Sequence, residues 1–166
     1  MIVAFRLPAR IEAIRRRHVP VATLGVPPHV TILFPFIPAD GLDAGIRTTL
    51  ARIAGRRRAF DVAFRHCAWF PDALYLQPTP ARPLGELIAD VSGAFSALPP
   101  YADPRLRAGD VEPHLTVAIG DRASLEPLLP HLTPELPVAG RARALSVIVE
   151  GTDGRWGLRW RLGFRP

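Results

Sequence analysis

The sequence predicts an α+β fold of two lobes that are related by an approximate twofold axis. Two observations lead to this prediction. Short apolar segments typical of strands alternate with segments whose apolar residues recur at helical spacing. The order strand, helix, strand, helix, strand also occurs twice along the chain. We therefore expect one two-lobed domain over residues 1–166, with repeat halves of roughly 1–70 and 73–166.

The composition is that of an ordinary globular domain. Of the 166 residues, 48% are hydrophobic and 22% are charged, which is enough to build one core. No apolar run reaches the roughly 18 residues of a membrane helix, and the first residues lack the order of a secretory signal. The single cysteine, Cys67, excludes an internal disulfide and a multi-cysteine zinc site. We expect a cytoplasmic protein that does not contact membranes.

The formal net charge of +6 favours an anionic partner such as RNA or a phosphorylated small molecule. All 21 basic residues are arginine, however, and the chain contains 19 prolines. This composition is also typical of a GC-rich coding sequence. The charge alone therefore leaves open whether the arginines serve binding.

In the first half of the chain, prolines, glycines and a capping aspartate mark the ends of the predicted elements. Pro8 ends a short strand and suits the first turn of the helix that follows. Asp40 is expected to cap the second helix and Gly55 to end it. The predicted order is strand 2–7, helix 9–18, strand 29–37, helix 41–54 and strand 60–68.

The second half repeats this order and adds one more strand. Its helices carry leucines, isoleucine and valine at helical spacing. A loop rich in proline and arginine precedes its second strand, and the turn 151–154 joins its last two strands. The predicted order is strand 73–77, helix 83–97, loop 99–113, strand 114–119, helix 122–132, and strands 143–150 and 156–164.

The motif Pro-His-apolar-Thr occurs three times, with its histidine at His29, His114 and His131. Apolar strand residues follow the first two copies, whereas a proline-containing turn at a helix end follows the third. Residues two apart on a strand point to the same face. His29 therefore shares a face with Thr31, and likewise His114 with Thr116. Two such strands side by side would bring both pairs of side chains to one cleft.

This pair of motifs indicates phosphoryl transfer. Imidazole titrates near neutral pH, so one histidine can deprotonate an incoming water or hydroxyl while the other protonates the leaving oxygen. Threonine hydroxyls can donate hydrogen bonds to the non-bridging phosphate oxygens. The scheme needs no metal ion and no cofactor, and no histidine in the sequence has the spacing of a zinc site. We expect His131 to be a surface or helix-capping residue.

The two strand-borne motifs and the elements around them resemble the 2H phosphoesterase superfamily. This superfamily includes bacterial and archaeal 2′-5′ RNA ligase-like proteins and RNA 2′,3′-cyclic phosphodiesterases. The resemblance covers nearly the whole chain, and the segment 25–36 is most similar to the short bacterial members. It implies a two-lobed α+β fold in which each lobe is a small antiparallel sheet with flanking helices, around a central cleft.

The resemblance also implies the roles of individual residues. His29 and His114 would be the catalytic acid–base pair, and Thr31 and Thr116 would contact the phosphate. Phe34 stands five residues after the first histidine, where many members carry a phenylalanine, and it would pack near the substrate's base. Strand alternation equally allows a place for Phe34 in the core.

Other side chains offer weaker candidates for binding. Arg105 and Arg107, in the loop before the second motif, are the arginines best placed to meet a phosphate. Glu112 could orient His114 or could simply be solvated. Five further aromatic residues could stack on bases, although strand and turn aromatics more often belong to a core: Trp69, Tyr75, Tyr101, Trp156 and Trp160.

These observations predict a metal-independent, monomeric phosphodiesterase. Its substrate would be a 2′,3′-cyclic phosphate or a 2′-linked phosphodiester of RNA or a nucleotide. Three alternatives remain open: a 2′-5′ RNA ligase, a phosphodiesterase specialised for a nucleotide metabolite, and an RNA-binding module without useful turnover. The sequence does not show which histidine is the base.

Overall fold

The computed structural model describes residues 1–166 and contains two four-stranded antiparallel sheets. The first sheet has the order β2-β1-β7-β8, with strands β1 (Ile2–Ala4), β2 (His29–Thr31), β7 (Ala144–Glu150) and β8 (Trp156–Gly163). The second has the order β5-β4-β3-β6, with strands β3 (Phe60–Phe70), β4 (Ala73–Thr79), β5 (Leu115–Ile119) and β6 (Val138–Ala142).

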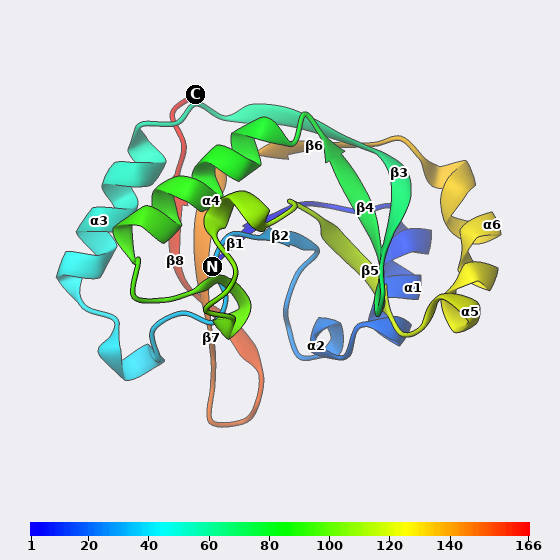
Figure 1. The fold of residues 1–166 in the computed structure, drawn as a ribbon, viewed down its shortest axis with the longest axis horizontal. Coiled ribbons are helices and arrows are strands. Elements are labelled where there is room, and N and C mark those ends of the chain that lie inside the picture. Colours follow the sequence, from blue (N-terminus) through cyan, green and yellow to red (C-terminus); the bar gives the residue numbers. More distant parts are fainter.

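Helices flank both sheets, as expected. They are α1 (Ala9–His18), α2 (Pro20–Thr23), α3 (Ala44–Gly55), α4 (Arg82–Ala94), α5 (Arg122–Leu125) and α6 (Leu129–Leu132). Short 3₁₀ turns lie at Ala39–Gly41, Pro100–Ala102, Ala108–Asp110, Glu126–Leu128 and Thr133–Glu135. Figure 1 shows α3 and α4 beside the first sheet, and α1, α5 and α6 beside the second. None of these helices has both the length and the apolar character that a membrane-spanning segment requires.

Each lobe combines strands from both halves of the sequence. β7 and β8 come from the second half but complete the first sheet, and β3 comes from the first half but pairs with β4 and β6. The helices are exchanged as well, because α1 packs against β5. The two sheet orders nevertheless correspond position by position, and a His-x-Thr strand forms one edge of each sheet. The lobes are therefore interleaved in the sequence, and neither coincides with a repeat half.

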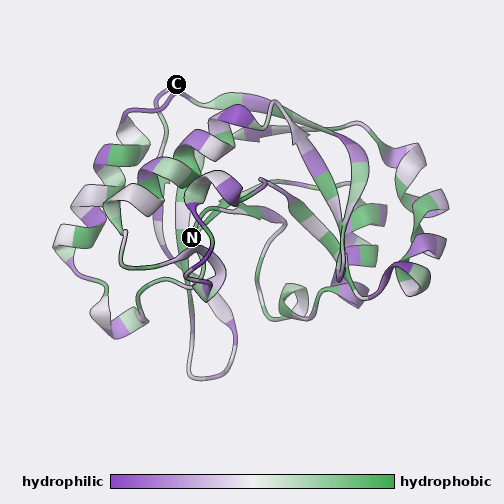
Figure 2. Ribbon diagram, in the orientation of Figure 1, coloured by the Kyte–Doolittle hydropathy of each residue, from purple (hydrophilic) through white to green (hydrophobic).

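One continuous apolar core joins the two lobes. Phe5, directly after β1, packs edge-on against Phe64 of β3 with ring centroids 5.1 Å apart. Gly140 of β6 allows this approach, because a β-carbon there would lie only 2.8 Å from Phe5 Cδ1. Figure 2 shows hydrophobic and hydrophilic residues alternating along α3 and α4. Leu84 and Leu87 of α4 are among the fully buried residues, as the helical spacing predicts.

The strand predicted over 29–37 is much shorter in the structure. β2 ends at Thr31, because its regular pairing with β1 ends there. The N–H groups of Ile32 and Leu33 both donate to the carbonyl of Met1. Pro35 and Pro38 then have no N–H to continue a ladder. The prediction of a long strand was wrong, and the freed segment forms part of a cavity wall described below.

Two helix predictions also need correction. The helix predicted over 41–54 begins at Ala44 and is capped by Asp43, whose carboxylate accepts a hydrogen bond of 2.8 Å from the N–H of Ile46. Asp40 lies in a 3₁₀ turn instead. The helix predicted over 122–132 is broken into α5, a 3₁₀ turn and α6, because Pro127 and Pro130 interrupt the hydrogen-bond pattern. The helix predicted over 9–18 is confirmed by α1.

The burial pattern predicts a stability difference between two chemically identical substitutions. Leu76 of β4 is 0% exposed, whereas Leu158 of β8 is 61% exposed. We expect Leu76→Ala to lower the free energy of unfolding by about 2–5 kcal/mol, because it leaves a cavity in the core. Leu158→Ala should change it by less than about 0.5 kcal/mol. Urea unfolding followed by circular dichroism measures both values, and similar losses in the two variants would contradict the assignment of the core.

Candidate active site

The two His-x-Thr motifs lie next to each other at the meeting point of the lobes. β2 and β5 are the edge strands of their sheets and pack against one another. Val30 is fully buried between the half-exposed His29 and Thr31, so the two polar side chains share one face. Leu115 and Val117 are buried on either side of the half-exposed Thr116 in the same way. The strand alternation inferred from the sequence is therefore confirmed for both motifs.

Both histidines are held by the same hydrogen bond. Nδ1 of His29 lies 2.7 Å from the carbonyl oxygen of Pro27, and Nδ1 of His114 lies 2.7 Å from that of Glu112. A carbonyl can only accept, so each Nδ1 carries the proton and donates it. In the neutral imidazole, Nε2 is then the unprotonated nitrogen. Each ring therefore has a fixed orientation and keeps Nε2 for proton transfer.

The surroundings of the two imidazoles differ in charge. Burial, together with the nearby positive charges of Arg15, the N-terminus and His114, lowers the pKa of His29 to about 4, although the hydrogen bond to the Pro27 carbonyl opposes this shift. Burial also lowers the pKa of His114, but the hydrogen bond to the Glu112 carbonyl and the Glu112 carboxylate counteract this. Both rings are therefore neutral at pH 7 in the free protein, and the protonated form is more disfavoured at His29.

Arg15 of α1 supports the loop that precedes β2. Its side chain is only 2% exposed and donates a 2.7 Å hydrogen bond to the carbonyl of Val26. Its other terminal nitrogen pairs with Glu12 at 3.1 Å, which balances the buried charge. This contact fixes the segment whose next residue, Pro27, accepts the hydrogen bond from His29.

Aromatic rings enclose His114. Phe70 and Tyr75 meet the imidazole with ring centroids at 4.8 Å and 5.4 Å, and Tyr101 lies nearly parallel to it at 6.5 Å. These rings exclude water from the imidazole and thereby explain the lowered pKa. The carboxylate of Glu112 accepts a 3.0 Å hydrogen bond from the amide of Gln77.

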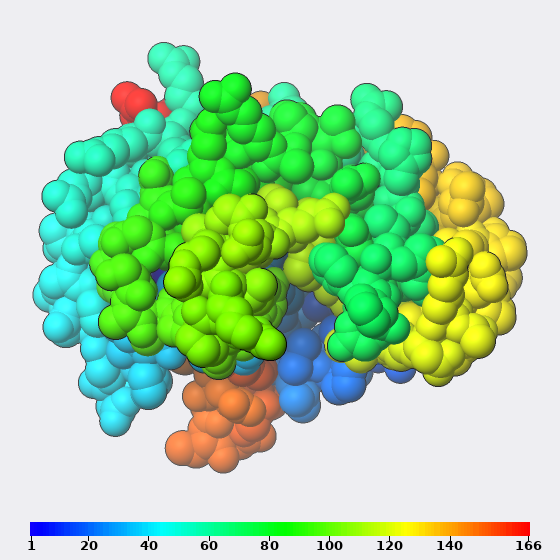
Figure 3. All heavy atoms as spheres, viewed as in Figure 1, coloured from blue at the N-terminus to red at the C-terminus, as the bar shows by residue number.

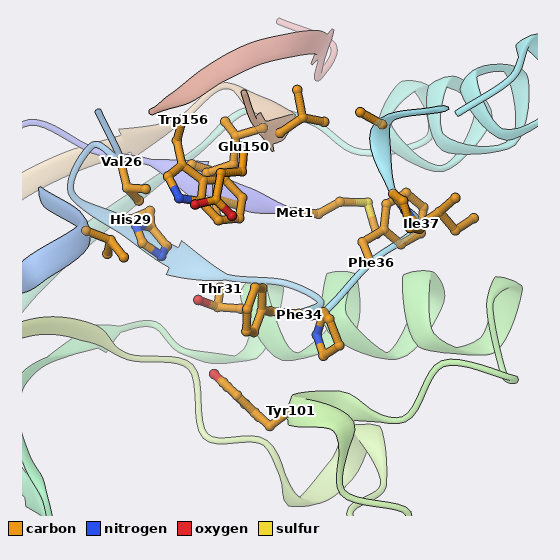
Figure 4. Close-up of a pocket in the computed structure, with 17 residues that line it drawn as sticks. Met1, Val26, His29, Thr31, Phe34, Phe36, Ile37, Tyr101, Glu150 and Trp156 are labelled. Atoms are coloured by element: carbon orange, nitrogen blue, oxygen red, sulfur yellow. The ribbon is translucent and has the colours of Figure 1, made fainter. Parts of the chain in front are cut away.

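Tyr101 connects the two motifs, and the sequence had not singled it out as a site residue. It has a left-handed backbone with φ 54°, and its N–H donates a 2.6 Å hydrogen bond to the carbonyl of Phe34. Figure 4 shows its hydroxyl pointing toward Thr31. Burial raises the pKa of Tyr101, and the interaction with Thr31 partly offsets this rise. Its ring, in contrast, faces His114.

Two cavities meet at Tyr101. The first, of about 520 Å³, lies beside His29 and Thr31 and is mostly apolar. The second, of about 460 Å³, lies beside His114 and Thr116. Figure 3 shows the surface hollowed between the loop that contains Tyr101 and the turn between β3 and β4. The four carboxylates of the two linings are Glu150, Asp72, Asp110 and Glu112, and neither lining contains an arginine.

Phe34 lies in the wall of the first cavity and is 50% exposed. It is not in the core, because β2 ends at Thr31 and strand alternation no longer applies beyond that residue. Trp156, at the start of β8, lines the same cavity (Figure 4).

The remaining candidates lie outside the two cavities. Arg105 is exposed and pairs with Asp103 at 2.8 Å. Arg107 donates to the carbonyl of Pro104 at 2.9 Å, and neither arginine lines either of the two cavities. His131 is exposed on α6. No three histidine, cysteine, aspartate or glutamate side chains lie close enough together to hold a metal ion.

Comparisons with known proteins place this geometry in a family. The model of the 2′-5′ RNA ligase superfamily matches residues 4–154. No curated protein matches the chain. Among solved structures, TT0787 of Thermus thermophilus is similar with 17% identity and a TM-score of 0.58, over 99% of this chain and 98% of that chain.

The E. coli protein LigT gives similar values. Its complex with 3′-AMP matches with 16% identity and a TM-score of 0.52, over 98% of this chain and 96% of that chain. Its apo form matches with 20% identity and a TM-score of 0.52, over 98% and 95%. These structures have the same two-lobed fold, and the resemblance to 2H phosphoesterases is confirmed. The chain belongs to the 2′-5′ RNA ligase superfamily.

Proposed function

We propose that the protein is a phosphodiesterase in which His29 and His114 act as base and acid on one phosphorus. Its substrate would be a 2′,3′-cyclic phosphate or a 2′-linked phosphodiester of RNA or a nucleotide. The observation that carries the proposal is the matching hydrogen bond of the two rings, which leaves two Nε2 atoms from adjacent edge strands for proton transfer. Membership of the superfamily supports the reaction class.

The charges around the histidines suggest the division of roles. Arg15 disfavours a protonated His29, which suits a base that must begin neutral. The carboxylate of Glu112 favours a protonated His114, which suits an acid. Nε2 of His29 would accept a proton from water as the water oxygen bonds to phosphorus. His114, in its protonated imidazolium form, would donate the proton of Nε2 to the ribose oxygen as the bond from that oxygen to phosphorus breaks.

The threonines and the first cavity would position the substrate. Thr31 and Thr116 lie on the same faces as the histidines and would donate hydrogen bonds to the non-bridging phosphate oxygens. The first cavity has the size and apolar lining of a small-molecule site. Phe34 and Trp156 in its wall would pack against a base. LigT has been crystallised with 3′-AMP and with ATP, which supports a nucleotide as the ligand.

The same groups would catalyse 2′-5′ ligation in reverse, since each acid becomes a base when the reaction runs backward. The family model, which is that of 2′-5′ RNA ligases, favours keeping this as a second candidate. Binding of RNA by Arg105 or Arg107 remains a prediction, as do the monomeric state and the cytoplasmic location.

The three copies of the motif provide a matched test. We expect His29→Ala and His114→Ala each to lower the rate of hydrolysis of 2′,3′-cyclic AMP by about 10²–10⁴-fold, because each removes one proton-transfer group. His131→Ala, which removes the exposed histidine of the third copy, should leave the rate unchanged. The assay contains EDTA, and thermal unfolding confirms that the variants fold. An equal loss in His131→Ala, or wild-type rates in either of the other two variants, would contradict the proposal.

The shifted pKa values predict an acidic optimum for kcat/KM, which reports on the free enzyme. As pH falls, activity should be lost near the pKa of His29, about 4, where the base becomes protonated. As pH rises, activity should already decline below 6.5, because the pKa of His114 is lowered from that value and the acid loses its proton. Glu112→Gln should move this upper limb to still lower pH. An optimum above pH 7 in the wild type would refute this division of roles.

The position of Tyr101 predicts an effect through Thr31. Tyr101→Phe keeps the ring beside His114 but removes the hydroxyl that faces Thr31, and we expect kcat to fall by about tenfold, the value of one hydrogen bond. In a Thr31→Ala background the same substitution should have little effect, because the partner is already absent. Full additivity of the two substitutions would show that Tyr101 does not act through Thr31.

A further inference from the structure

A third cavity, of about 640 Å³, differs from the two catalytic cavities in its charge. Four arginines line it, and no acidic residue does: Arg6, Arg141, Arg143 and Arg161. We call this cavity the arginine groove. It lies where the end of β1, β6, β7 and β8 come together. The sequence had left open whether the arginines serve binding, and this groove is where four of them converge.

Three of the four arginines have no ionic partner. Arg6, Arg143 and Arg161 are exposed and lie within 4.0 Å of no carboxylate, whereas Arg141 pairs with Asp61 at 2.8 Å. Unpaired cations that line one concave surface repel each other, and an anion between them relieves this repulsion. The groove therefore has the electrostatics of an anion site.

The groove continues the surface that carries the first catalytic motif. Ile2 and Ala4 point to the same face of β1, because they are two residues apart. Ile2 lines the cavity beside His29, whereas Ala4 lines the arginine groove and is paired in register with His29 itself. On β7, Ile148 lines the first cavity and Ser146 lines the groove. The groove and the catalytic cavity are consecutive parts of one sheet face.

The distance along the strand suits neighbouring groups of one ligand. Arg6 follows Ala4 by two residues, which is about 7 Å in extended chain. A ligand whose reacting phosphate lies at His29 would thus reach the first arginine of the groove with its next anionic group. Neither catalytic cavity contains an arginine, whereas the adjoining groove has four.

We propose that the arginine groove is a second anion site that holds phosphates of a nucleic acid strand whose terminal phosphodiester lies between His29 and His114. The inference rests on the proposed function, because it takes the reacting phosphate as the point from which the strand extends. Guanidinium groups match phosphate oxygens with two parallel hydrogen bonds. An acidic protein segment is less well supported, since the groove leads into a site built for a phosphodiester.

The test compares two double variants that remove the same charge. Arg6→Ala/Arg161→Ala removes two unpaired arginines of the groove. Arg47→Ala/Arg52→Ala removes two exposed arginines of α3 that do not line the groove. Binding of a fluorescein-labelled single-stranded RNA of about ten nucleotides is followed by anisotropy at several salt concentrations. Hydrolysis of 2′,3′-cyclic AMP and of an RNA that ends in a 2′,3′-cyclic phosphate is measured in parallel.

We expect the groove variant to bind the RNA roughly tenfold more weakly than the control, as two exposed ion pairs would predict. Its salt slope should be smaller by about 1.4, since each phosphate contact contributes about 0.7 for a single strand. The groove variant should also lose kcat/KM for the RNA while keeping the wild-type rate on 2′,3′-cyclic AMP.

Equal affinities and salt slopes in the two double variants would overturn the inference. So would displacement of the RNA by polyglutamate as readily as by unlabelled RNA, because the groove would then prefer acidic polymers in general. These outcomes are independent of turnover. If no cyclic phosphate is hydrolysed but the groove variant still loses RNA affinity, the proposed function fails and the anion site stands.

Discussion

The hydrogen bond from each histidine Nδ1 to a carbonyl two residues earlier is the contact on which the site depends. In both motifs a proline stands between the carbonyl and the imidazole: Pro28 before His29, and Pro113 before His114. A residue that precedes proline is restricted to extended backbone, so both accepting carbonyls belong to conformationally restricted residues. The hydrogen bond to Nδ1 then turns Nε2 of each ring outward. In the third motif the proline lies within α6, and Nδ1 of His131 meets an arginine side chain instead.

The fold makes this local arrangement useful by bringing two edge strands together. β2 and β5 belong to different sheets, and the strands and helices exchanged between the lobes hold the sheets around one core. The two rings then meet different charges, since Arg15 lies near one and Glu112 near the other. The face of the first sheet is divided as well, with an apolar cavity at one end and the arginine groove at the other. These two parts match a nucleic acid strand, whose bases suit the apolar cavity and whose phosphates suit the arginine groove.

Local patterns predicted the elements whose ends are set by nearby residues. The helix over 9–18 was predicted from its apolar spacing and from Pro8, and the structure has it at those residues. The end of the strand over 29–37 could not be predicted, because it depends on where the hydrogen-bond pairing with β1 ends, and β1 is distant in the sequence. Tyr101 was not distinguished from other aromatic residues. Its place in the site depends on a left-handed backbone and on a hydrogen bond to Phe34, neither of which has a periodic signal.

The sequence by itself determined the local arrangement of the two motifs: which histidines stand at the start of strands, which threonines share their faces, and why the third copy differs. These properties depend on neighbouring residues and on strand alternation, which act over a few positions. The tertiary structure alone decided how the strands are shared between the lobes, that Phe34 and Tyr101 face the cavities, and that four arginines spread over the chain line one groove. Such contacts join residues distant in sequence, and no local pattern encodes them.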